Sequence, residues 1–484
     1  MAIGGQVGHG NRRFGCFLIS SPQGRSGKTV VTLGLCDLFK RQGLSVQPFK
    51  KGPDYIDPSW LTVAAGRSCR NLDPFLIPRD KLIQTFGEAC RKADLAVIEG
   101  AMGLYDGLNS HGTTAEVARI LNAPILLVVN ASRMTGSIAA MVTGYQRFEK
   151  DIRIAGVILN YVSGPRHEEK LRSAVDQHCG IPVLGSLPKD QDLHLAERHL
   201  GLIPTIESGE AESLVEKIGR RMEPHVDLDR LSMIARSFKP DPSFPLARRE
   251  KAGRRGGTRH GERVRIGVVR DRAFNFYYPE NLEALTDQGA ELLYINSFSD
   301  RLPSVDGLYI GGGFPEFFLR ELEENRRLRK EIAREVERGL PVYAECAGLM
   351  YLCRSVRWED RSYEMVGVLP SRVELSKRPR GHGYVVARVT AENPLWPLGL
   401  TVRGHEFHHS GLFDCDDIRF AYQVERGQGI RGGKDGIVYK NVFASYIHVH
   451  ASGTPEWAPR FVTLASRAKA GLKVSHAEEQ ICIN

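Results

Sequence analysis

The feature that most constrains the fold is an alternation of short apolar segments with helix-like stretches, which runs through the first half of the chain. The apolar segments are FGCFLIS, LSVQPF, LAVIEG, PILLVVN, IAGVILN and IPVLGSL. Helix-like stretches lie between them, for example at residues 29–41 and 115–121. Continuously apolar strands separated by helices are typical of a parallel sheet that is covered on both faces. We therefore predict an α/β domain built on a parallel sheet.

The same alternation starts again near residue 263. The apolar segments VRIGVV, ELLYIN, GLYIGG and PVYAEC are accompanied by predicted helices at residues 279–288 and 321–339. Shorter strands follow in GYVVARVT, IRFAYQV and GIVYKNVFASYIHV, and they predict a mixed or antiparallel extension. A chain of 484 residues has room for two domains. We place them at residues 14–235 and 263–470.

A basic segment, ARREKAGRRGGTRHGER, lies between the two predicted domains. It carries seven basic and two acidic residues, so it accounts for five of the nine net positive charges of the chain. The segment is rich in glycine and shows no apolar periodicity, which is typical of a solvated linker. We therefore predict a flexible linker at residues 236–262 and no nucleic-acid partner.

The sequence shows no sign of a membrane or secreted protein. The first residues lack an apolar segment, and the longest apolar stretches, such as APILLVV, are far shorter than a membrane span. The nine cysteines include no C-x-x-C pair, which argues against a disulfide framework and a structural zinc site. We expect a cytoplasmic protein.

A phosphate-binding loop is predicted near the start of the first domain. The strand FGCFLISS, the turn PQGRSGK and an amphipathic helix closed by Gly43 follow one another directly. This order aims backbone N–H groups and the positive end of a helix at phosphates. Gly27 and Lys28 would then hold the phosphates of ATP, and Thr29 would place its hydroxyl on Mg²⁺.

The loop departs from the common pattern G-x-x-x-x-G-K-S/T, because Pro22 stands at the first glycine. Ser21 instead aligns with the first glycine of a loop that is one residue longer, which resembles that of the dethiobiotin synthetase class. In that class ATP activates a carboxylate-type acceptor. The switch ATPases of the ParA/MinD type carry a signature lysine where this chain has Gln23. The loop therefore favours carboxylate activation over a nucleotide switch.

Acidic and basic side chains gather after two further strands of the first domain. PFKKGPDYIDP and VIEGAMGLYDG supply Lys50, Lys51, Asp54, Asp57, Glu99 and Asp106. Ligands of an open parallel sheet collect beyond the carboxyl ends of its strands, so the four acids should converge on the phosphate loop. Carboxylates at that place suit Mg²⁺, which prefers oxygen ligands and bridges phosphate oxygens.

A thiol site is predicted in the second domain. In PVYAECAGLMYL, Cys346 follows an apolar strand and precedes a helix that starts near Gly348. Such a turn exposes a nucleophile and lines up backbone N–H groups for an oxyanion. The predicted oxyanion donors are the backbone N–H groups of Gly312, Gly313 and Ala347.

Two histidines near the end of the second domain could serve this thiol as a base. NVFASYIHVHA places His448 and His450 on one face of a strand, and either could take the proton of the cysteine.

The sequence HEFHH, residues 405–409, satisfies the metalloprotease pattern H-E-x-x-H. That pattern needs a helix to bring both histidines to one face. Gly404 before it and Ser410 with Gly411 after it leave too little room for a long helix. We predict a structural or substrate-contacting role for His405 and Glu406.

Long motifs in both domains resemble the cobyrinate a,c-diamide synthases, glutamine-dependent amidotransferases of corrinoid biosynthesis. They are QPFKKGPDYIDPSW, RNLDPF, IEGAMGLYDG, ERHLGLIP, FNFYYPENLEAL, GLYIGGGFPE, AECAGLMYL, RGHEFHHSGL and ASYIHVH. The resemblance covers roughly residues 14–466. It implies an α/β protein with an N-terminal P-loop domain like that of dethiobiotin synthetase and a C-terminal class I glutamine amidotransferase domain.

The resemblance also implies roles for individual residues of the second domain. Cys346 would attack the side-chain amide of glutamine, and His448 would move the proton. Many class I glutaminases have a glutamate two places after this histidine, where this chain has His450. A catalytic dyad is therefore expected, and the ammonia that it releases would pass to the first domain.

In the first domain the resemblance implies that ATP phosphorylates the a and c acetate carboxylates of a tetrapyrrole, which ammonia then converts to amides. Asp54 and Glu99 would hold the metal, Asp57 and Asp106 would position the substrate, and Asn160 would lie on the adenine side. The implied small-molecule partners are glutamine and a tetrapyrrole polycarboxylate, and a homodimer is an open expectation.

Two alternatives remain open from the sequence. Relatives with the same motifs amidate Ni-sirohydrochlorin or sirohaem, and the Ser21–Pro22 loop and the Lys50–Lys51 pair differ from what is expected of cobyrinate enzymes. A more distant alternative is a nucleotide-gated binding protein whose glutaminase domain is inactive.

Overall fold

The computed structural model describes residues 14–108, 111–190, 197–198, 201–240 and 263–471. The chain divides into two compact units after Arg254. Most of the predicted linker at residues 236–262 lies outside the described residues. No helix of the described residues is long and apolar enough to cross a bilayer.

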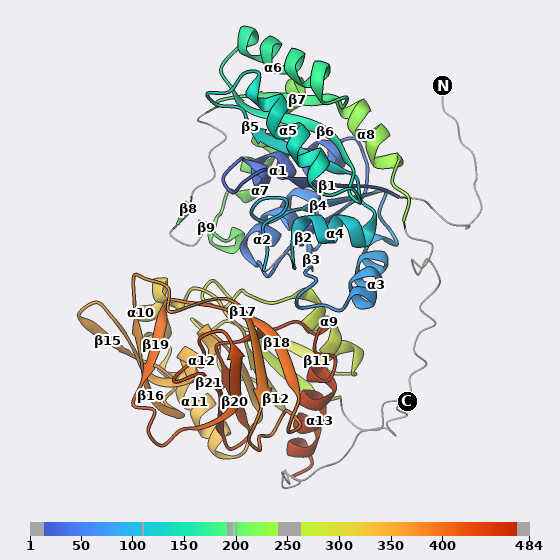
Figure 1. Ribbon diagram of the computed structural model, residues 1–484. Coiled ribbons are helices and arrows are strands. Elements are labelled where there is room, and N and C mark those ends of the chain that lie inside the picture. The colour runs from blue at the N-terminus through green and yellow to red at the C-terminus, as the bar shows by residue number, and fades with distance from the viewer. Residues whose placement is uncertain (1–13, 109–110, 191–196, 199–200, 241–262, 472–484) are drawn as a thin grey trace. The chain divides into compact units, whose positions relative to one another are not determined.

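The first unit is built on a seven-stranded sheet in which every pair of neighbours is parallel (Figure 1). The spatial order is β3-β2-β4-β1-β5-β6-β7. The strands are β1 (Gly15–Ser20), β2 (Val46–Lys51), β3 (Arg70–Leu72), β4 (Leu95–Glu99), β5 (Ile125–Asn130), β6 (Ile154–Val162) and β7 (Val183–Pro188). The predicted parallel sheet is confirmed.

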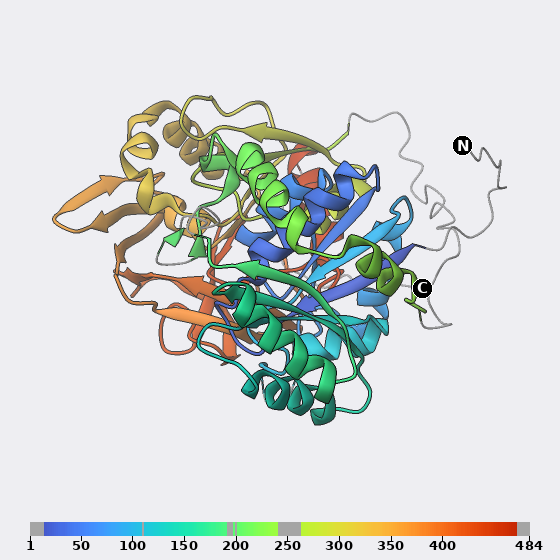
Figure 2. The same ribbon diagram turned by 90° about the horizontal axis from the view of Figure 1, so that it is seen from above.

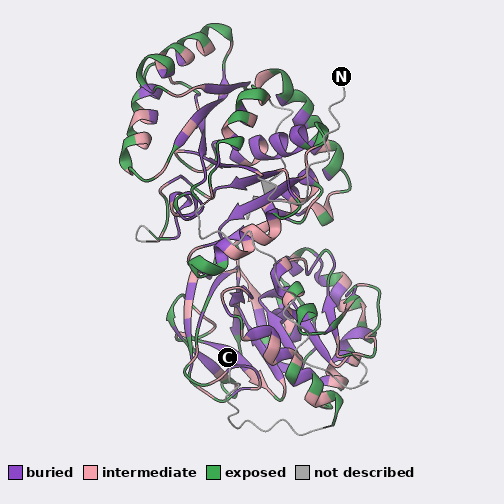
Figure 3. Ribbon diagram, turned by 90° about the vertical axis from the view of Figure 1, so that its right-hand side faces the viewer, coloured by how far each residue is buried: buried purple, intermediate pink, exposed green. Residues whose placement is uncertain are grey.

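Helices cover both faces of this sheet (Figure 2). One face carries α1 (Lys28–Arg41), α2 (Ile56–Ala65) and α7 (Ala211–Met222). The other carries α3 (Arg79–Cys90), α4 (Thr114–Leu121), α5 (Ser137–Phe148) and α6 (Pro165–His178). Burial from both sides explains why β1 is buried along its whole length and why its residues are almost all apolar (Figure 3).

The remaining elements of the first unit are short. Helix α8 (Leu228–Arg236) packs on β1, where Ala235 lies against Gly15. The other elements are the hairpin of β8 (Glu197–Arg198) and β9 (Gly201–Leu202) and the 3-10 turns η2 (Thr205–Glu207) and η3 (Glu223–His225).

The second unit is built on a ten-stranded mixed sheet with the order β11-β10-β12-β13-β22-β21-β20-β17-β18-β23. Its parallel part has β10 (Arg265–Val269), β11 (Glu291–Ile295), β12 (Gly307–Ile310), β13 (Val342–Glu345) and β22 (Val442–Ser445). Its antiparallel part has β17 (Gly381–Val389), β18 (Thr401–His408), β20 (Arg419–Arg426), β21 (Lys434–Tyr439) and β23 (His448–Val449). The predicted antiparallel extension therefore continues the parallel sheet.

Besides this sheet, the described residues of the second unit form five helices, a 3-10 turn and a small second sheet. The helices are α9 (Pro279–Asp287), α10 (Leu319–Glu324), α11 (Arg326–Glu337), α12 (Ala347–Leu352) and α13 (Trp457–Lys469), and the turn is η4 (Pro315–Phe317). The small sheet has β14 (Cys353–Trp358), β15 (Arg361–Glu364), β16 (Leu369–Leu375) and β19 (Ser410–Phe413).

The single helix predicted at residues 321–339 is wrong, because the chain forms two helices there. Asn325 separates α10 from α11, and its side chain accepts a hydrogen bond from the backbone N–H of Leu328 at 3.2 Å. Asparagine favours this N-cap position because its side-chain oxygen satisfies an N–H group that the first helical turn leaves without a partner.

Candidate active sites

The phosphate loop joins β1 to α1, and its path depends on Gly27. This residue has a φ of +87°, in the left-handed region that favours glycine. A Cβ atom there would lie 2.1 Å from Nδ2 of Asn160, at the carboxyl end of β6. The same Nδ2 donates a hydrogen bond to the carbonyl oxygen of Ser26 at 2.9 Å. The structure thus brings two of the predicted nucleotide-binding residues, Gly27 and Asn160, into direct contact.

Lys28 is buried and is held by two neutral oxygens. Its Nζ donates to Oγ of Ser21 at 2.8 Å and to the carbonyl oxygen of Met102 at 2.6 Å. Burial lowers the pKa of Lys28 to about 8, with a further contribution from the positive charge of Lys50. Ser21, which replaces an expected glycine, therefore supplies a partner for the loop lysine. Neutral partners leave the ammonium able to exchange them for phosphate oxygens.

The acids predicted after β2 and β4 meet around Lys50. Its Nζ lies 2.5 Å from Oδ2 of Asp57, 2.6 Å from Oε1 of Glu99 and 3.8 Å from Oδ2 of Asp54. Thr29, in the first turn of α1, donates from Oγ1 to Oε1 of Glu99 at 2.9 Å. The structure therefore gathers Thr29, Asp54, Asp57 and Glu99 into one cluster with a lysine at its centre, where only the convergence of the acids was predicted.

The pKa values of the two aspartates of this cluster are shifted in opposite directions. Burial, together with the charge of Asp57, raises the pKa of Asp54 to about 7. Burial would also raise the pKa of Asp57, but the ammonium of Lys50 and its hydrogen bond hold it below the ordinary value. Asp57 is therefore the permanent anion of the pair, and Asp54 can carry a proton near neutral pH.

Glu99 offers an oxygen for a metal ion. Its side chain is fully buried, and among the described residues Oε2 has no hydrogen-bond partner. A buried carboxylate oxygen without a partner is costly unless a cation or a donor completes it. No three His, Cys, Asp or Glu side chains in the described ranges form a metal-binding group. Mg²⁺ usually takes one or two carboxylates and completes its shell with phosphate and water, so Glu99 and Thr29 fit this ion.

Asp106 lies apart from the Lys50 cluster and is exposed. Its Oδ2 accepts a hydrogen bond from the backbone N–H of Gly103 at 2.7 Å. A Cβ atom at position 103 would lie 2.5 Å from the carbonyl oxygen of Pro22, so this turn packs closely against the phosphate loop. The structure therefore places Asp106 beside the phosphate loop, in the segment that follows Glu99 and apart from the Lys50 cluster.

In the second unit, Cys346 occupies a strained turn between β13 and α12. Its φ of +49° and ψ of −100° lie outside the ordinary regions for a residue with a side chain. Gly348 allows this turn, because a Cβ atom there would lie 2.2 Å from the carbonyl oxygen of Ile310 on β12. Burial raises the pKa of the Cys346 thiol, so the thiol needs a base to become a nucleophile.

His448 lies on a strand end next to this turn. The backbone N–H of Cys346 donates to the carbonyl oxygen of Ser445, at the end of β22, at 2.8 Å. Three residues later, His448 pairs with His405 of β18, and the two rings stack at 4.9 Å with an interplanar angle of 15°. A Cβ atom at Gly312 would lie 2.4 Å from Cε1 of His448. The imidazole therefore sits against the glycine segment that follows β12.

His450, the other candidate base, is turned toward a different acid. Its Nε2 lies 3.5 Å from Oε2 of Glu280, in the first turn of α9. Its Nδ1 accepts from the backbone N–H of Ser452 at 3.2 Å, and its ring packs on Tyr278 with 4.6 Å between centroids. His450 therefore faces Glu280, Ser452 and Tyr278, which favours His448 as the base.

Glu345 is a site residue that the sequence reasoning missed. It is the last residue of β13, directly before Cys346, and only 1% of it is exposed. Its Oε2 lies 3.5 Å from Nδ1 of His448. The sequence does carry a signal for it, because an acidic residue ends an otherwise apolar and buried strand. The resemblance to class I glutaminases points only to the position after the histidine, which is His450 in this chain.

Two of the three predicted oxyanion donors, Ala347 and Gly312, contact the thiol or the imidazole. Ala347 is the first residue of α12, and its backbone N–H favours the thiolate form of Cys346. Gly312 packs on His448, as described above. Gly313 follows with a φ of +156°, and a Cβ atom there would lie 2.0 Å from the carbonyl oxygen of Ala273. A side chain at position 312 or 313 would therefore collide with neighbouring atoms.

The HEFHH segment lies in and just after strand β18, so it does not have the helical geometry of a metalloprotease site. Nε2 of His405 shares a hydrogen bond with the hydroxyl of Tyr278 at 2.9 Å. Glu406 accepts hydrogen bonds from the backbone N–H groups of Gln428 and Gly429. These contacts give His405 a place beside His448 and give Glu406 a structural role.

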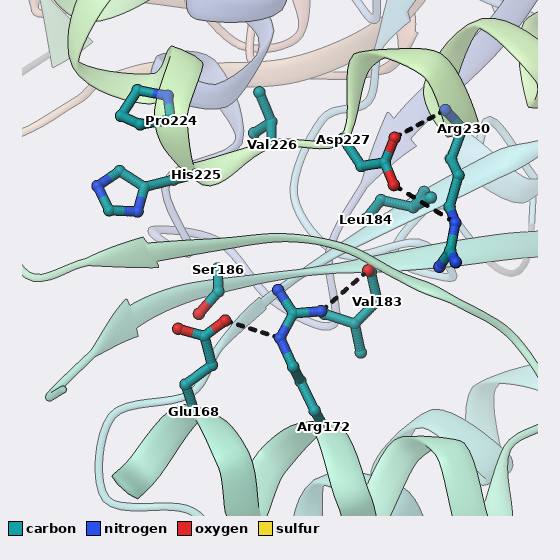
Figure 4. Close-up of a pocket in the computed structure, with 10 residues that line it drawn as sticks. All are labelled: Glu168, Arg172, Val183, Leu184, Ser186, Pro224, His225, Val226, Asp227 and Arg230. Atoms are coloured by element: carbon teal, nitrogen blue, oxygen red, sulfur yellow. Dashed lines mark hydrogen bonds and ion pairs between the residues drawn. The ribbon is translucent and has the colours of Figure 1, made fainter. Parts of the chain in front are cut away.

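A separate pocket of about 520 Å³ opens at the edge strand β7 (Figure 4). Its charged side chains pair locally: Arg172 with Glu168 at 2.7 Å and Arg230 with Asp227 at 3.4 Å. None of the predicted site residues lines it. This pocket is therefore not part of either candidate site.

Comparison with known proteins identifies both units. Residues 265–456 match the family model of the CobB/CobQ-like glutamine amidotransferase domain, and residues 17–203 match the CobQ/CobB/MinD/ParA nucleotide binding domain. A cobyrinate a,c-diamide synthase from Magnetococcus marinus is 45% identical, over 91% of this chain and 95% of its own. Those from Archaeoglobus fulgidus and Methanothermobacter thermautotrophicus are each 41% identical, over 93% and 90% of this chain and 98% and 96% of their own. The chain, with its nucleotide-binding unit and its glutamine amidotransferase unit, belongs to the cobyrinate a,c-diamide synthase family.

Proposed function

We propose that this protein converts the a and c acetate groups of cobyrinate to amides, with glutamine as the nitrogen donor and ATP as the energy source. The observation that carries the proposal is the 45% identity to a cobyrinate a,c-diamide synthase along nearly the full length of both chains. This identity spans the phosphate loop, the Lys50 cluster and the Cys346 turn. The side-chain contacts in these sites suit glutamine hydrolysis in the second unit and ATP-dependent activation of a carboxylate in the first.

In the glutaminase reaction, Sγ of Cys346 attacks the side-chain carbonyl carbon of glutamine. His448 takes the thiol proton and gives it to the departing nitrogen, so that the C–N bond breaks and ammonia leaves. Backbone N–H groups of Gly312, Gly313 and Ala347 stabilise the negative oxygen of the tetrahedral intermediate. Water then attacks the thioester, which releases glutamate and regenerates the thiol.

In the ligase reaction, a substrate carboxylate oxygen attacks the γ-phosphorus of ATP, and ADP leaves. Ammonia attacks the carbonyl carbon of the acyl phosphate, phosphate leaves, and the nitrogen loses a proton. Gly27 shapes the phosphate loop, and Lys28 neutralises phosphate charge. Asn160, which contacts this loop, lies on the adenine side.

The remaining residues of the first unit hold the metal and the acceptor. Thr29, Asp54 and Glu99 would hold Mg²⁺, which would neutralise phosphate charge there. Asp57 and Asp106 position the acceptor carboxylate. Lys50 keeps Asp57 ionised and holds the acids together.

The proposal has further parts that rest on the sequence. The two domains are residues 14–235 and 263–470. Glutamine and cobyrinate are the small-molecule substrates, no nucleic acid takes part, and the protein acts in the cytoplasm. A homodimer is part of the proposal.

Mass spectrometry of the products tests the substrate. The purified protein is given ATP, Mg²⁺ and glutamine with cobyrinate, sirohydrochlorin, Ni-sirohydrochlorin or sirohaem in separate reactions. We expect two carboxyl-to-amide conversions on cobyrinate. Conversion of only a sirohydrochlorin or sirohaem substrate would overturn the proposed substrate, and no conversion of any of them together with no glutamine hydrolysis would favour a binding protein.

A further inference from the structure

We propose that Glu345 is the positioning residue for His448, so that the glutaminase site is a triad whose carboxylate comes from the residue directly before the nucleophile. This inference rests on the proposed glutaminase reaction. It replaces the dyad that was expected because His450 stands where many class I glutaminases have a glutamate.

The side chains of Glu345 and His448 face each other in the interior of the second unit. Oε2 of Glu345 and Nδ1 of His448 are 3.5 Å apart, and each residue is only 1% exposed. This separation is longer than an ordinary hydrogen bond, and contacts between catalytic groups often shorten when the substrate binds. A carboxylate at Nδ1 selects the tautomer with the proton on that nitrogen, which leaves Nε2 as the basic nitrogen.

Glu345 is itself held in place. Tyr343 and Glu345 are two residues apart on β13 and point to the same face, and Tyr309 is the partner of Tyr343 on β12. Their hydroxyl groups donate to Glu345 at 2.8 Å and 3.1 Å, and the backbone N–H of Val449 donates at 3.1 Å. Burial raises the pKa of both tyrosines, so they remain neutral donors. The orientation of the carboxylate is thus fixed in advance.

The surroundings of the His448 imidazole support the same role. His405 stacks on His448, and burial lowers the pKa of His405 well below its ordinary value, so this ring is neutral. His450 pairs with Glu280. Glu345 is therefore the carboxylate that faces His448, and it stabilises the imidazolium that forms while His448 carries the thiol proton.

The kinetic test uses Glu345→Gln and Glu345→Asp, with Glu280→Gln as the matched control at the other buried acid–histidine pair. We expect Glu345→Gln to lower kcat for glutamine hydrolysis at least about tenfold while KM changes less than about twofold. Glu345→Asp keeps the charge and should recover part of the loss. Glu280→Gln should keep kcat, and ammonia-dependent amidation should persist in all three variants.

A spectroscopic test separates positioning from a structural role. Protein labelled with ¹⁵N-histidine should show an Nδ1–H tautomer for His448, assigned by its disappearance in His448→Gln. We expect Glu345→Gln to lose this tautomer. An unchanged tautomer, or an unchanged kcat in folded Glu345→Gln, would overturn the inference. If the wild-type protein does not hydrolyse glutamine, the proposed function fails, and the tautomer still decides the role of Glu345.

Discussion

The phosphate loop should be especially sensitive to a single methyl group at Gly27. Gly27→Ala places a Cβ atom 2.1 Å from Nδ2 of Asn160, in a backbone conformation with a φ of +87°. Gly43, which closes the same helix, has nearly the same φ of +85°, but nothing lies within 4 Å of the position of its Cβ. Gly43→Ala is therefore a matched control that carries the backbone strain without the contact.

The size of the effect follows from these two contributions. An L-residue in the left-handed region costs about 1–2 kcal/mol, and both variants bear this cost in their free energy of unfolding. Gly27→Ala also displaces Asn160, whose hydrogen bond to Ser26 is worth about 0.5–1.5 kcal/mol. Since 1.4 kcal/mol corresponds to a factor of ten in affinity, we expect ATP binding to weaken about tenfold in Gly27→Ala. It should be unchanged in Gly43→Ala.

The assay combines urea unfolding with calorimetric titration of ATP for both single variants, Asn160→Ala and the Gly27→Ala/Asn160→Ala double variant. Removal of the Asn160 side chain removes the atom that the new methyl group meets. The unfolding cost of Gly27→Ala should then fall to that of Gly43→Ala.

Two results would refute this reasoning. Wild-type ATP affinity in Gly27→Ala would show that the loop does not bind the phosphates. If Gly27→Ala lowers the free energy of unfolding equally with and without the Asn160 side chain, the contact between the new methyl group and Asn160 does not contribute.

Three further predictions concern the two sites. Cys346→Ala should abolish amidation with glutamine but retain it with ammonia to within about twofold, as measured by product mass; activity with glutamine would exclude Cys346 as the nucleophile. Lys50→Met removes the positive charge that pairs with the carboxylates of Asp57 and Glu99. It should therefore lower the free energy of unfolding by about 3–5 kcal/mol. Lys51→Met should lower the free energy of unfolding by less, because burial lowers the pKa of Lys51 and so already disfavours its charge. Equal losses of unfolding free energy for the two variants, measured with urea, would contradict this. Burial raises the pKa of Asp54 to about 7, so its stabilising contribution is complete at low pH and is lost as the pH rises through that value. Asp54→Asn should therefore gain in Tm relative to the wild type between about pH 5 and about pH 8, and a difference that does not vary with pH would count against the raised pKa.

The sequence predicts those parts of the fold and sites that depend on neighbours along the chain. The alternation of apolar strands and helices predicts the parallel sheet of the first unit, which the structure confirms. The strand, turn and helix around Gly27 and Lys28 form one continuous segment, so their joint appearance is readable without a structure. The convergence of Asp54, Asp57 and Glu99 is predictable because parallel strands end at the same edge of a sheet.

The parts that were missed depend on contacts between distant segments. Glu345 meets His448 only because β13 pairs with β22, and because β18 pairs with β23, which fixes the position of the histidine. Lys50 was expected near the acids, but its place at their centre depends on side-chain directions that the sequence does not show. The break at Asn325 interrupts a stretch whose helical pattern continues on both sides, so the pattern alone does not reveal it.

The hydrogen bonds that Lys28 donates to Ser21 and Met102 have a consequence for the binding and release of nucleotide. If Lys28 binds phosphate as proposed, a nucleotide that enters the loop must compete with the two oxygens that accept hydrogen bonds from this lysine. Its net gain is only the difference between the old partners and the new ones. On the departure of ADP, the same two oxygens would accept hydrogen bonds from the lysine again, which would favour release. The proposed reaction forms two amides on each macrocycle, so ADP must leave twice. Partners that return to Lys28 would favour each release.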